Sequence, residues 1–339
     1  MSSRLFPPLL KPGQTIGFFS PSSAATAWAP NRFARAKAFL EGQGFKLAAG
    51  SLTGQQEYWR SGSIKARAAE FNALIRDPEV RCIMSVIGGN NSNSLLPHID
   101  YDALRQDPKI IVGYSDVTAL LLGIYARTGL VTFYGPAMVA SFGELSPLVD
   151  ETLAGFTRIA LAGEAKVPCR LPTPAQWSEE RLDWENQGRA KHCLANRLIS
   201  VGSGKVRGCL IGGNLNTMAG IWGSPYMPAI NPGDILFIED SLKSAEVVER
   251  AFAHLKLCGV FDRIGGLILG KHELFNDQGS GKRPLDILLE VVGEPTFPIL
   301  AEFDCAHTHP MLTLPLGIDA ELDLDAQSLT LLEHWWHES

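Results

Sequence analysis

Short apolar runs bounded by turn residues recur along the N-terminal half of the chain. Arg81–Ile87 (RCIMSVI) is almost continuously apolar, as is typical of a strand whose sheet is covered on both faces. Runs of this length and composition predict β-strands, because buried helices are usually longer. The predicted strands are Thr15–Ser20, Arg81–Ile87, Ile110–Tyr114 and Val131–Tyr134.

Amphipathic segments separate these strands and predict helices, because their apolar residues recur every three or four positions. Asp150 is expected to be the N-cap of the last of them. In the first, the face expected to be buried carries Phe33, Ala36, Ala38 and Phe39. The predicted helices are Asn31–Glu41, Ile64–Ile75, Asp116–Arg127 and Asp150–Leu161.

The alternation of strands and helices predicts an α/β fold with a parallel sheet and helices on both faces. In such sheets, ligands bind beyond the carboxyl ends of the strands. The loops at residues 20–23, 88–92 and 114–116 follow predicted strands, so they are expected to share that edge.

The pattern changes after residue 162. Residues 163–204 are rich in Pro, Trp, Gly and mixed charges without clear periodicity, and they are expected to form a linker and a surface loop. The chain is therefore divided into an N-terminal domain (1–162), this linker (163–204) and a C-terminal domain (205–339). The elements predicted in the C-terminal domain are the strands Val206–Ile211, Asp234–Glu239 and Gly266–Gly270, a strand near Glu321–Leu332, and the helix Ala245–Leu257.

Composition adds few constraints. A length of 339 residues agrees with two domains, and the net charge of −6 gives no reason to expect nucleic acid or an anionic membrane as a partner. The N-terminus lacks the apolar core of a signal peptide, and no apolar run is long enough to span a bilayer, so a cytoplasmic protein is expected. The six cysteines form no CxxC pair, which argues against a zinc ribbon.

Ser115 is the first candidate for chemistry. It lies between a predicted strand and a predicted helix, in KIIVGYSDVTALLLGIYAR. Such a junction exposes a side chain above the sheet and places helix N-terminal amides beside it, where they can stabilise an oxyanion. The layout resembles the nucleophile elbow, although the sequence is GYSD rather than GxSxG. Alternatively, Ser115 simply caps the helix.

Gly88-Gly89 ends the preceding strand and allows a close approach of backbone to ligand. The Gly89 amide is therefore a candidate second oxyanion donor, although an ordinary turn explains the glycines equally well. Neither a Walker pattern nor GxGxxG is present, so the turn does not indicate a phosphate site.

Glu239 and two histidines complete the candidate chemistry. Glu239 ends the apolar strand ILFIED, and His307 and His309 lie in AEFDCAHTHP. An HxH pair can bind a metal, but no further cluster of ligands at suitable spacing supports a metal site. One of the histidines could instead take the Ser115 proton while Glu239 orients it. Because these residues come from both predicted domains, the site is expected between them.

Six segments together resemble the LD-carboxypeptidase and microcin-immunity family of serine peptidases. The resemblance covers nearly the whole chain and implies a flavodoxin-like N-terminal domain, a smaller β-rich C-terminal domain and a homodimer. It also implies amide hydrolysis beside a terminal carboxylate, with no cofactor and no metal. The segments are PGQTIGFFSPSS, GGNNSNSLLPHIDYDAL, IVGYSDVTALLLGIYARTGLVTFYGP, RGCLIGGNLNTM, ILFIEDSLK and FDCAHTHPMLTLPLG.

The resemblance also implies roles for single residues. His309 falls outside the position of the family base, so it is expected to be a neighbour of the site. The implied roles are Ser115 as nucleophile, Glu239 as orienting acid, His307 as base, and the backbone amides of Gly89 and Asp116 as oxyanion donors.

The family has two branches, and this chain resembles the microcin-immunity branch more closely. That branch cuts the amide between an aspartyl residue and a nucleotide-like group in a processed antibiotic, and so gives antibiotic resistance. The sequence leaves open which of two tryptophans stacks on the nucleobase of the substrate. Either tryptophan could instead only attach its loop to the rest of the protein by packing. The implied substrate contacts are Asn91, Ser92, Asn214, Lys243 and Trp177 or Trp184.

The expected protein is therefore a serine carboxypeptidase that acts on a small peptide or an aminoacyl nucleotide. Within the family, the alternative is an LD-carboxypeptidase that removes the terminal D-alanine of murein tetrapeptide. Two alternatives lie outside it: a ligand-binding protein without activity on the same fold, and a metal-dependent hydrolase that uses His307 and His309.

Overall fold

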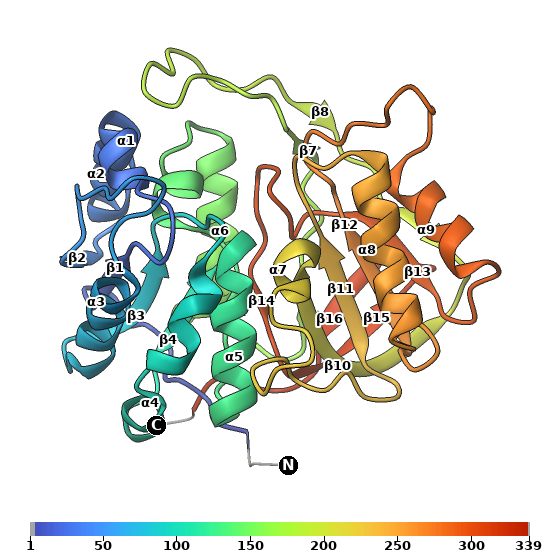
Figure 1. The fold of residues 1–339 in the computed structure, drawn as a ribbon, viewed down its shortest axis with the longest axis horizontal. Helices are drawn as coiled ribbons and strands as arrows, with labels where there is room; N and C mark the ends of the chain where they lie inside the picture. The colour runs from blue at the N-terminus through green and yellow to red at the C-terminus, as the bar shows by residue number, and fades with distance from the viewer. Residues whose placement is uncertain (1–3, 338–339) are drawn as a thin grey trace.

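Two β-sheets organise residues 4–337, the part of the chain that the structure, a computed structural model, describes (Figure 1). The first sheet consists of β1 (Thr15–Phe19), β2 (Lys46–Ala49), β3 (Val80–Ser85), β4 (Ile110–Gly113), β5 (Phe133–Tyr134) and β14 (Leu314–Pro315). Its order is β14-β5-β4-β3-β1-β2, and β1 to β5 run parallel. The predicted parallel α/β sheet is thereby confirmed.

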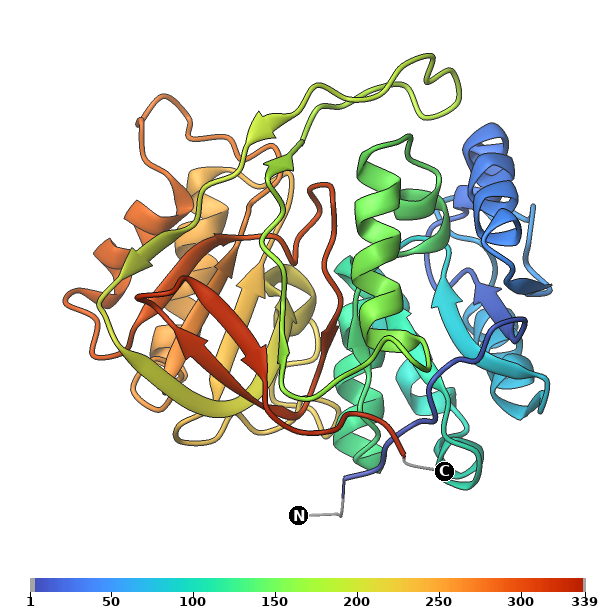
Figure 2. The same ribbon diagram turned by 180° about the vertical axis from the view of Figure 1, so that it is seen from behind.

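Helices cover both faces of this sheet. They are α1 (Ala25–Trp28), α2 (Pro30–Gly42), α3 (Ile64–Arg76), α4 (Tyr101–Gln106), α5 (Thr118–Thr128) and α6 (Leu148–Ala160). Helices α3, α4 and α5 lie in front of the sheet in Figure 1, whereas α6 lies in front in the reverse view of Figure 2. This two-sided cover explains why β4 is apolar and buried along its whole length.

The buried face of α2 differs from the predicted one. Arg32, Ala36 and Leu40 are buried, whereas Ala38 is exposed. The helix is rotated in this way because the Arg32 guanidinium has polar partners inside the protein, donating to the carbonyl oxygens of residues 139 and 140 at 3.0 and 2.9 Å. A periodicity argument that assigns arginine to the surface cannot find this face.

The start of α6 also differs. The helix begins at Leu148, and Pro147 occupies the N-cap position, so the prediction that Asp150 caps it is wrong. The fixed φ of proline suits the start of a helix. Asp150 lies in the first turn instead, where its carboxylate interacts favourably with the positive end of the helix dipole.

The second sheet has eight strands in the C-terminal part of the chain. Its four central strands run parallel, and the outer strands pair antiparallel. Its strands, in spatial order, are β6 (Cys169–Arg170), β16 (Ser328–Leu331), β15 (Ile318–Asp323), β10 (Lys205–Asn214), β11 (Ile235–Glu239), β12 (Gly266–Gly270), β13 (Ile299–Phe303) and β9 (Ile199–Val201). The associated helices are α7 (Leu215–Ala219), α8 (Ala245–Leu257) and α9 (Pro284–Val292).

The single strand predicted near Glu321–Leu332 is a hairpin. Strands β15 and β16 pair antiparallel across a turn in which Gln327 has a φ of +47°. The alternation of apolar and polar residues continues through LDLDAQSLT, so the pattern alone does not reveal the reversal.

Residues 163–204, expected to lack regular structure, contribute four short strands. Strands β6 and β9 extend opposite ends of the second sheet, and β7 (Gln176–Trp177) pairs with β8 (Leu194–Ala195). Strands of two or three residues are too short to show a period, which is why the sequence does not predict them. Residues 178–193, here called the β7–β8 loop, reach from the second sheet toward α1 and α2 (Figure 1).

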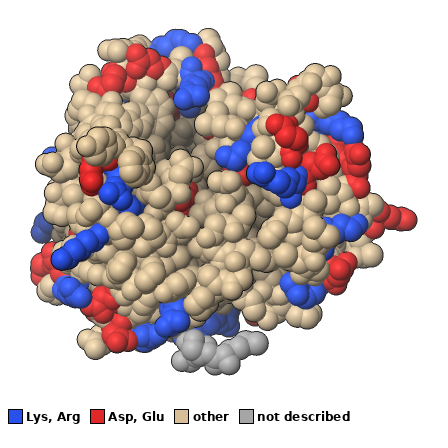
Figure 3. Space-filling model, viewed as in Figure 1, with Lys and Arg blue, Asp and Glu red and all other residues tan. Residues whose placement is uncertain are grey.

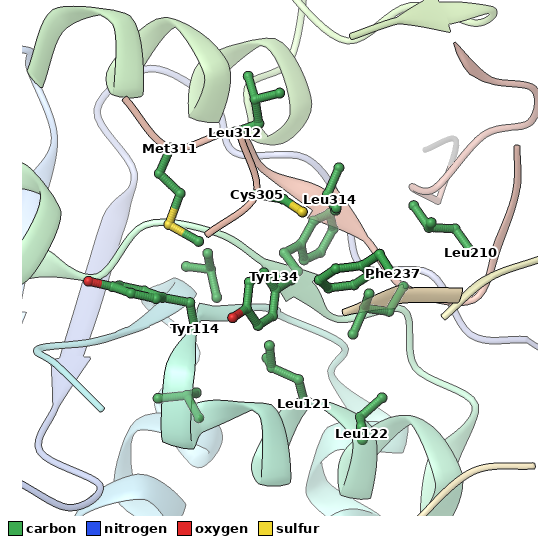
Figure 4. Packing of buried hydrophobic residues seen from close by; sticks show 14 of the residues in the cluster. Tyr114, Leu121, Leu122, Tyr134, Leu210, Phe237, Cys305, Met311, Leu312 and Leu314 are labelled. Atoms are coloured by element: carbon green, nitrogen blue, oxygen red, sulfur yellow. The ribbon is translucent and has the colours of Figure 1, made fainter. Parts of the chain in front are cut away.

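The two sheets share one core. Strand β14 from the C-terminal part completes the first sheet by pairing with β5. Figure 4 shows Tyr134 of the first sheet packed beside Phe237 of the second, with ring centroids 4.9 Å apart. No helix within residues 4–337 is long and apolar enough to cross a membrane.

Candidate active site

Ser115 lies at the turn between β4 and α5 and has an unusual backbone conformation. Its φ of +61° falls in the left-handed region, which residues other than glycine rarely adopt. A 3₁₀ turn, Ser115–Val117, leads into α5, and the N-cap positions of the two helices belong to Tyr114 and Val117. Ser115 is therefore not a helix cap. A strained strand–turn–helix junction of this kind exposes a nucleophile above the sheet.

His307 and Glu239 form a hydrogen-bonded pair. The distance from His307 Nδ1 to Glu239 Oε2 is 2.7 Å, and Glu239 is completely buried at the end of β11. The other carboxylate oxygen accepts hydrogen bonds from the Tyr134 hydroxyl and from Asn214 Nδ2. Because the carboxylate faces Nδ1, the neutral imidazole carries its proton there and keeps Nε2 free to accept one.

The surroundings of this pair favour its ionised form. Burial raises the pKa of Glu239, but His307 and the hydrogen bonds from Tyr134 and Asn214 outweigh it and leave the pKa lowered. Burial lowers the pKa of His307, but the nearby carboxylates, led by Glu239, outweigh it and leave the pKa raised. An imidazolium formed at His307 is thus stabilised, as a general base requires.

A cavity of about 560 Å³ contains these groups. Ser115 and Gly89 line it from the first sheet, His307 and Lys243 from the second, and residues 180–185 from the β7–β8 loop. Figure 3 shows the surface hollowed between the two halves of the molecule. The chain thus supplies a serine and a histidine–carboxylate pair to one solvent-accessible space.

The turn after β3 lies directly against Ser115. A Cβ atom on Gly88 would be 2.9 Å from Ser115 Cβ and 3.0 Å from the Asp116 amide nitrogen. Gly89 has a φ of +150°, and a Cβ there would lie 2.2 Å from Ser22 Oγ. Only glycine allows this close approach of the turn to Ser115 and to the Asp116 amide.

Asn91 and Ser92, which are predicted to contact substrate, are not among the residues that line the cavity. Their backbone amides donate to Asp116 Oδ2 at 3.0 and 2.9 Å, and Ser92 is completely buried. The Asn91 side chain accepts a hydrogen bond from Arg67 at 2.7 Å. Both residues therefore hold the glycine turn in place from behind.

Asn214 and Lys243 both line the cavity, but they differ in how many of their polar atoms are free. Asn214 Oδ1 accepts from the backbone and hydroxyl of Thr217, and Nδ2 donates to Glu239 and Asp240. Asn214 thus already caps α7 and steadies Glu239. Among residues 4–337, the one ion-pair partner of Lys243 Nζ is Asp240, at 3.7 Å, so the ammonium keeps capacity for a ligand.

The two candidate tryptophans lie in different places. Trp184 lines the cavity and stacks on Trp28, with ring centroids 5.3 Å apart. The guanidinium of Arg32 lies 4.3 Å from the Trp184 ring. Trp177 does not line the cavity and instead has Lys271 Nζ 5.2 Å from its ring. Of the two candidates, Trp184 is the one that lines the cavity. Trp28, which lines the cavity beside it, was missed by the sequence argument.

His309 does not form a metal site with His307. Within residues 4–337, no group of three or more His, Cys, Asp or Glu residues is arranged to hold a metal ion. His309 is buried, which lowers the pKa of its imidazole, and its backbone pairs with Ser178. It anchors the β7–β8 loop next to the cavity.

Comparison with known proteins identifies the family. The model of the LD-carboxypeptidase N-terminal domain matches residues 16–135, and that of the LD-carboxypeptidase C-terminal domain matches residues 207–322. The chain belongs to the LD-carboxypeptidase family. It is accordingly a hydrolase of the serine carboxypeptidase class.

Relatives and solved structures refine this assignment. A protein of Vibrio cholerae serotype O1, provisionally named a carboxypeptidase, is 61% identical over 98% of both chains. The microcin C7 self-immunity protein MccF of Escherichia coli is 54% identical over 95% of this chain and 94% of its own. The structure of MccF in complex with aspartyl sulfamoyl adenosine matches with a TM-score of 0.96 at 53% identity, covering 98% of this chain and all of that one.

Several cavity residues of this LD-carboxypeptidase family member had no signal in the sequence. Lys191 and Glu273 line the cavity, and burial raises the pKa of the Glu273 carboxyl. Tyr134 bonds Glu239 from behind. Lys191 and Glu273 stand in segments without a local motif, whereas Tyr134 lies in TFYGP, part of a segment that carries the family resemblance. Only the packing of the two sheets and the β7–β8 loop brings the three residues to the site. Gly88 is a further cavity residue, and it had a signal as the neighbour of Gly89.

Proposed function

We propose that this protein is a serine amidase that hydrolyses aminoacyl-nucleotide antibiotics through Ser115, His307 and Glu239. The observation that carries the proposal is the buried pair of His307 and Glu239, which opens into the same cavity as a serine in left-handed conformation. Nucleophile, base and orienting acid are the three parts that acyl transfer of this type needs.

In the proposed mechanism, Ser115 Oγ attacks the amide carbonyl carbon while His307 Nε2 takes the hydroxyl proton. Glu239 stabilises the resulting imidazolium, and the amides of Gly89 and Asp116 donate to the oxyanion. The C–N bond then breaks as His307 gives its proton to the leaving nitrogen. Water hydrolyses the acyl-enzyme, with His307 again as base, and Ser115 is regenerated.

The proposed substrate has a carboxylate at one end and a nucleoside at the other. Lys243 is the cavity cation that would bind the carboxylate, with Asn214 beside it. Trp184 and Trp28 offer aromatic surface for the base. Support comes from MccF, whose structures include complexes with aspartyl sulfamoyl adenosine and glutamyl sulfamoyl guanosine.

Variants of MccF support the same assignment. One MccF structure is an active-site mutant in which a serine, an asparagine and a lysine are replaced by alanine. Another has a tryptophan replaced by phenylalanine and contains adenosine monophosphate. Our proposal assigns the corresponding roles here to Ser115, Asn214, Lys243 and Trp184.

Mass spectrometry of the products tests the proposal. The purified protein and its Ser115→Ala variant are incubated separately with aspartyl sulfamoyl adenosine and with murein tetrapeptide. We expect release of aspartate from the nucleoside substrate by the wild type alone. Equal cleavage by the variant would overturn the role of Ser115.

The second substrate distinguishes the two branches of the family. The murein tetrapeptide carboxypeptidase of Pseudomonas aeruginosa is 27% identical over 62% of this chain. Release of D-alanine with the nucleoside substrate intact would move the protein to that activity. Binding without cleavage of either substrate would favour a ligand-binding protein.

We further propose that the protein acts as a cytoplasmic homodimer and gives resistance to such antibiotics, as the family resemblance implies. Light scattering measures the dimer, and the inhibitory concentration of a processed microcin on expressing cells measures resistance.

The proposed division into residues 1–162, 163–204 and 205–339 predicts first proteolytic cleavage in the β7–β8 loop. The two family models, which match on either side of residues 163–204, support this division.

A further inference from the structure

A cluster of three charged residues forms part of the cavity wall beside the β7–β8 loop. The Glu144 carboxylate lies 3.1 Å from Arg32 Nη2 and 3.5 Å from Lys191 Nζ. All three side chains are at least nine-tenths buried: Arg32 and Glu144 are fully buried, and the Lys191 side chain is 5% exposed. Two cations thus share the Glu144 carboxylate, and Lys191 also interacts electrostatically with Glu273, whose carboxyl has a pKa raised by burial.

Of the three residues in this cluster, Lys191 faces the cavity. It lines the cavity, whereas Arg32 and Glu144 lie behind the wall. The Arg32 guanidinium already donates hydrogen bonds to Glu144, to Gln187 and to two backbone carbonyl oxygens. Lys191 has three donor hydrogens, and among the described residues its one ion pair is the 3.5 Å contact with Glu144, beside an electrostatic interaction with Glu273.

The neighbouring histidine is also incompletely bonded. His309 lines the same cavity, and its Nδ1 atom is buried without a hydrogen-bond partner in the described part of the chain. Burial lowers the pKa of both His309 and Lys191, as expected for groups whose charge lacks full compensation. Buried polar groups are normally bonded, so a ligand group that accepts hydrogen bonds would complete the bonding of Lys191.

The position of Lys191 indicates which part of a substrate it meets. Through Glu144 it connects to Arg32, whose guanidinium lies 4.3 Å from the Trp184 ring. It also interacts electrostatically with His309, which is two residues from His307. Lys191 therefore lies between the base of the triad and the aromatic end of the cavity.

We propose that Lys191 binds the anionic sulfamoyl or phosphoryl group that links the scissile amide to the nucleoside. This inference rests on the proposed function and specifies its substrate class. In an acyl sulfamate or acyl phosphoramidate, the leaving nitrogen is bonded directly to the sulfur or phosphorus, so the linker oxygens lie between the carbonyl and the ribose. A peptide such as murein tetrapeptide has no anion at that point.

The cluster is more than a buried ion pair. Arg32 alone neutralises Glu144 at 3.1 Å and with better geometry, so Lys191 is not needed for that purpose. A second buried cation costs desolvation free energy unless something compensates for it. Burial raises the pKa of Glu273, the other carboxyl that interacts with Lys191, so an anionic linker is the better source of both compensating charge and acceptors.

The test compares two substrates that differ only in the linker. One is aspartyl sulfamoyl adenosine, and the other is the neutral aspartyl amide of 5′-amino-5′-deoxyadenosine. The readout is the ratio of kcat/KM for the anionic substrate to kcat/KM for the neutral one. We expect Lys191→Met to lower this ratio about 10- to 100-fold, as for loss of a charge-assisted hydrogen bond, and Lys191→Arg to restore part of it.

Lys243→Met is the matched control. It also removes a cavity lysine, but one proposed to bind the aspartyl carboxylate that both substrates carry. It should therefore slow both substrates by a similar factor and leave the ratio within about threefold of the wild type. A folded Lys191→Met protein with the wild-type ratio would overturn the proposal.

A binding measurement on the wild type needs no variant and no turnover. By calorimetry, adenosine monophosphate should bind at least about tenfold more tightly than adenosine, since only the former carries the anion. Equal affinities would overturn the Lys191 site. If the protein cleaves neither nucleoside in a Ser115-dependent manner, the proposed function fails, while this affinity ratio still decides the proposal for Lys191.

Discussion

The two walls of the cavity differ in how completely their polar groups are bonded. Behind the wall formed by the first sheet, Asp116 accepts hydrogen bonds from the amides of Asn91 and Ser92, and Arg67 donates to Asn91. On the wall beside the β7–β8 loop, Lys191 has one long contact with a carboxylate, and His309 Nδ1 has no partner within residues 4–337.

This difference corresponds to two kinds of task. Oxyanion donors act only if they are fixed before the substrate arrives, and a saturated network fixes them. Groups that recognise a substrate need donors or acceptors that have no partner in the free protein, so that the substrate can bond them. We therefore expect changes in the saturated wall to affect kcat and changes in the open wall to affect KM and substrate choice.

Replacing the nucleophile should have the largest effect. Ser115→Ala removes the attacking oxygen, and we expect kcat to fall roughly 10⁴-fold or more, while thermal unfolding stays close to that of the wild type. Single-turnover kinetics with aspartyl sulfamoyl adenosine measure the loss. A fall of less than about tenfold would mean that another group starts the reaction.

Glu239→Gln should come next, with a loss of about 10² to 10⁴ in kcat, because the amide no longer stabilises the imidazolium. His307 must be neutral to act as a base, so activity should fall as pH drops below its raised pKa. Removing the Glu239 carboxylate removes the main cause that raises this pKa. The acid limb of the kcat/KM profile should therefore move to lower pH.

Asp240→Asn is the control for this pH shift. Asp240 also raises the pKa of His307, but Glu239 and Glu273 both raise it more. Its replacement should therefore move the acid limb in the same direction by a smaller amount. An acid limb that is the same in wild type and Glu239→Gln would assign the limb to a group other than His307.

Replacing Asp116, the acceptor of the fully bonded network behind the first-sheet wall, should lower kcat less than replacing Glu239 does. Asp116→Ala leaves the amides of Asn91 and Ser92 without their acceptor, and we expect about 10- to 100-fold lower kcat with little change in KM, and partial rescue by Asp116→Asn. Glu70→Ala is the matched control, since Glu70 is also buried and accepts from two backbone amides, those of Ser20 and Leu52. Equal kcat losses at equal stability in the two alanine variants would contradict a specific role for Asp116.

The smallest effect should come from the aromatic end of the open wall. Trp184→Ala should raise KM for aspartyl sulfamoyl adenosine about 5- to 30-fold, equivalent to about 1–2 kcal/mol of stacking, and leave kcat nearly unchanged. Trp177→Ala, whose ring does not line the cavity, should change KM by less than about threefold. Equal effects of both variants would mean that these tryptophans act only by holding the loop.

Local patterns in the sequence were sufficient for much of the first sheet. The apolar runs at Arg81–Ile87 and Ile110–Tyr114 became β3 and β4, because continuous apolar character reports a strand covered on both faces. The sequence also indicated the Gly88-Gly89 turn and the serine after a strand. A close approach of the backbone to another group, or a strained turn, restricts which residue types can stand at a position. The burial of Arg32 could not be predicted from the sequence, because its hydrogen-bond partners Val139 and Glu144 are about 110 residues away along the chain.

The sequence by itself determined the alternating α/β pattern and, through its family resemblance, the residues of the proposed triad. Only the tertiary structure decided that Trp184 rather than Trp177 lines the cavity, that Asn91 and Ser92 brace a turn, and that Lys191 faces the cavity. The physical reason is the range of the interactions. Periodicity and turn chemistry act between residues close in sequence, whereas the β7–β8 loop and the two cavity walls are assembled from segments that meet only when both sheets pack together.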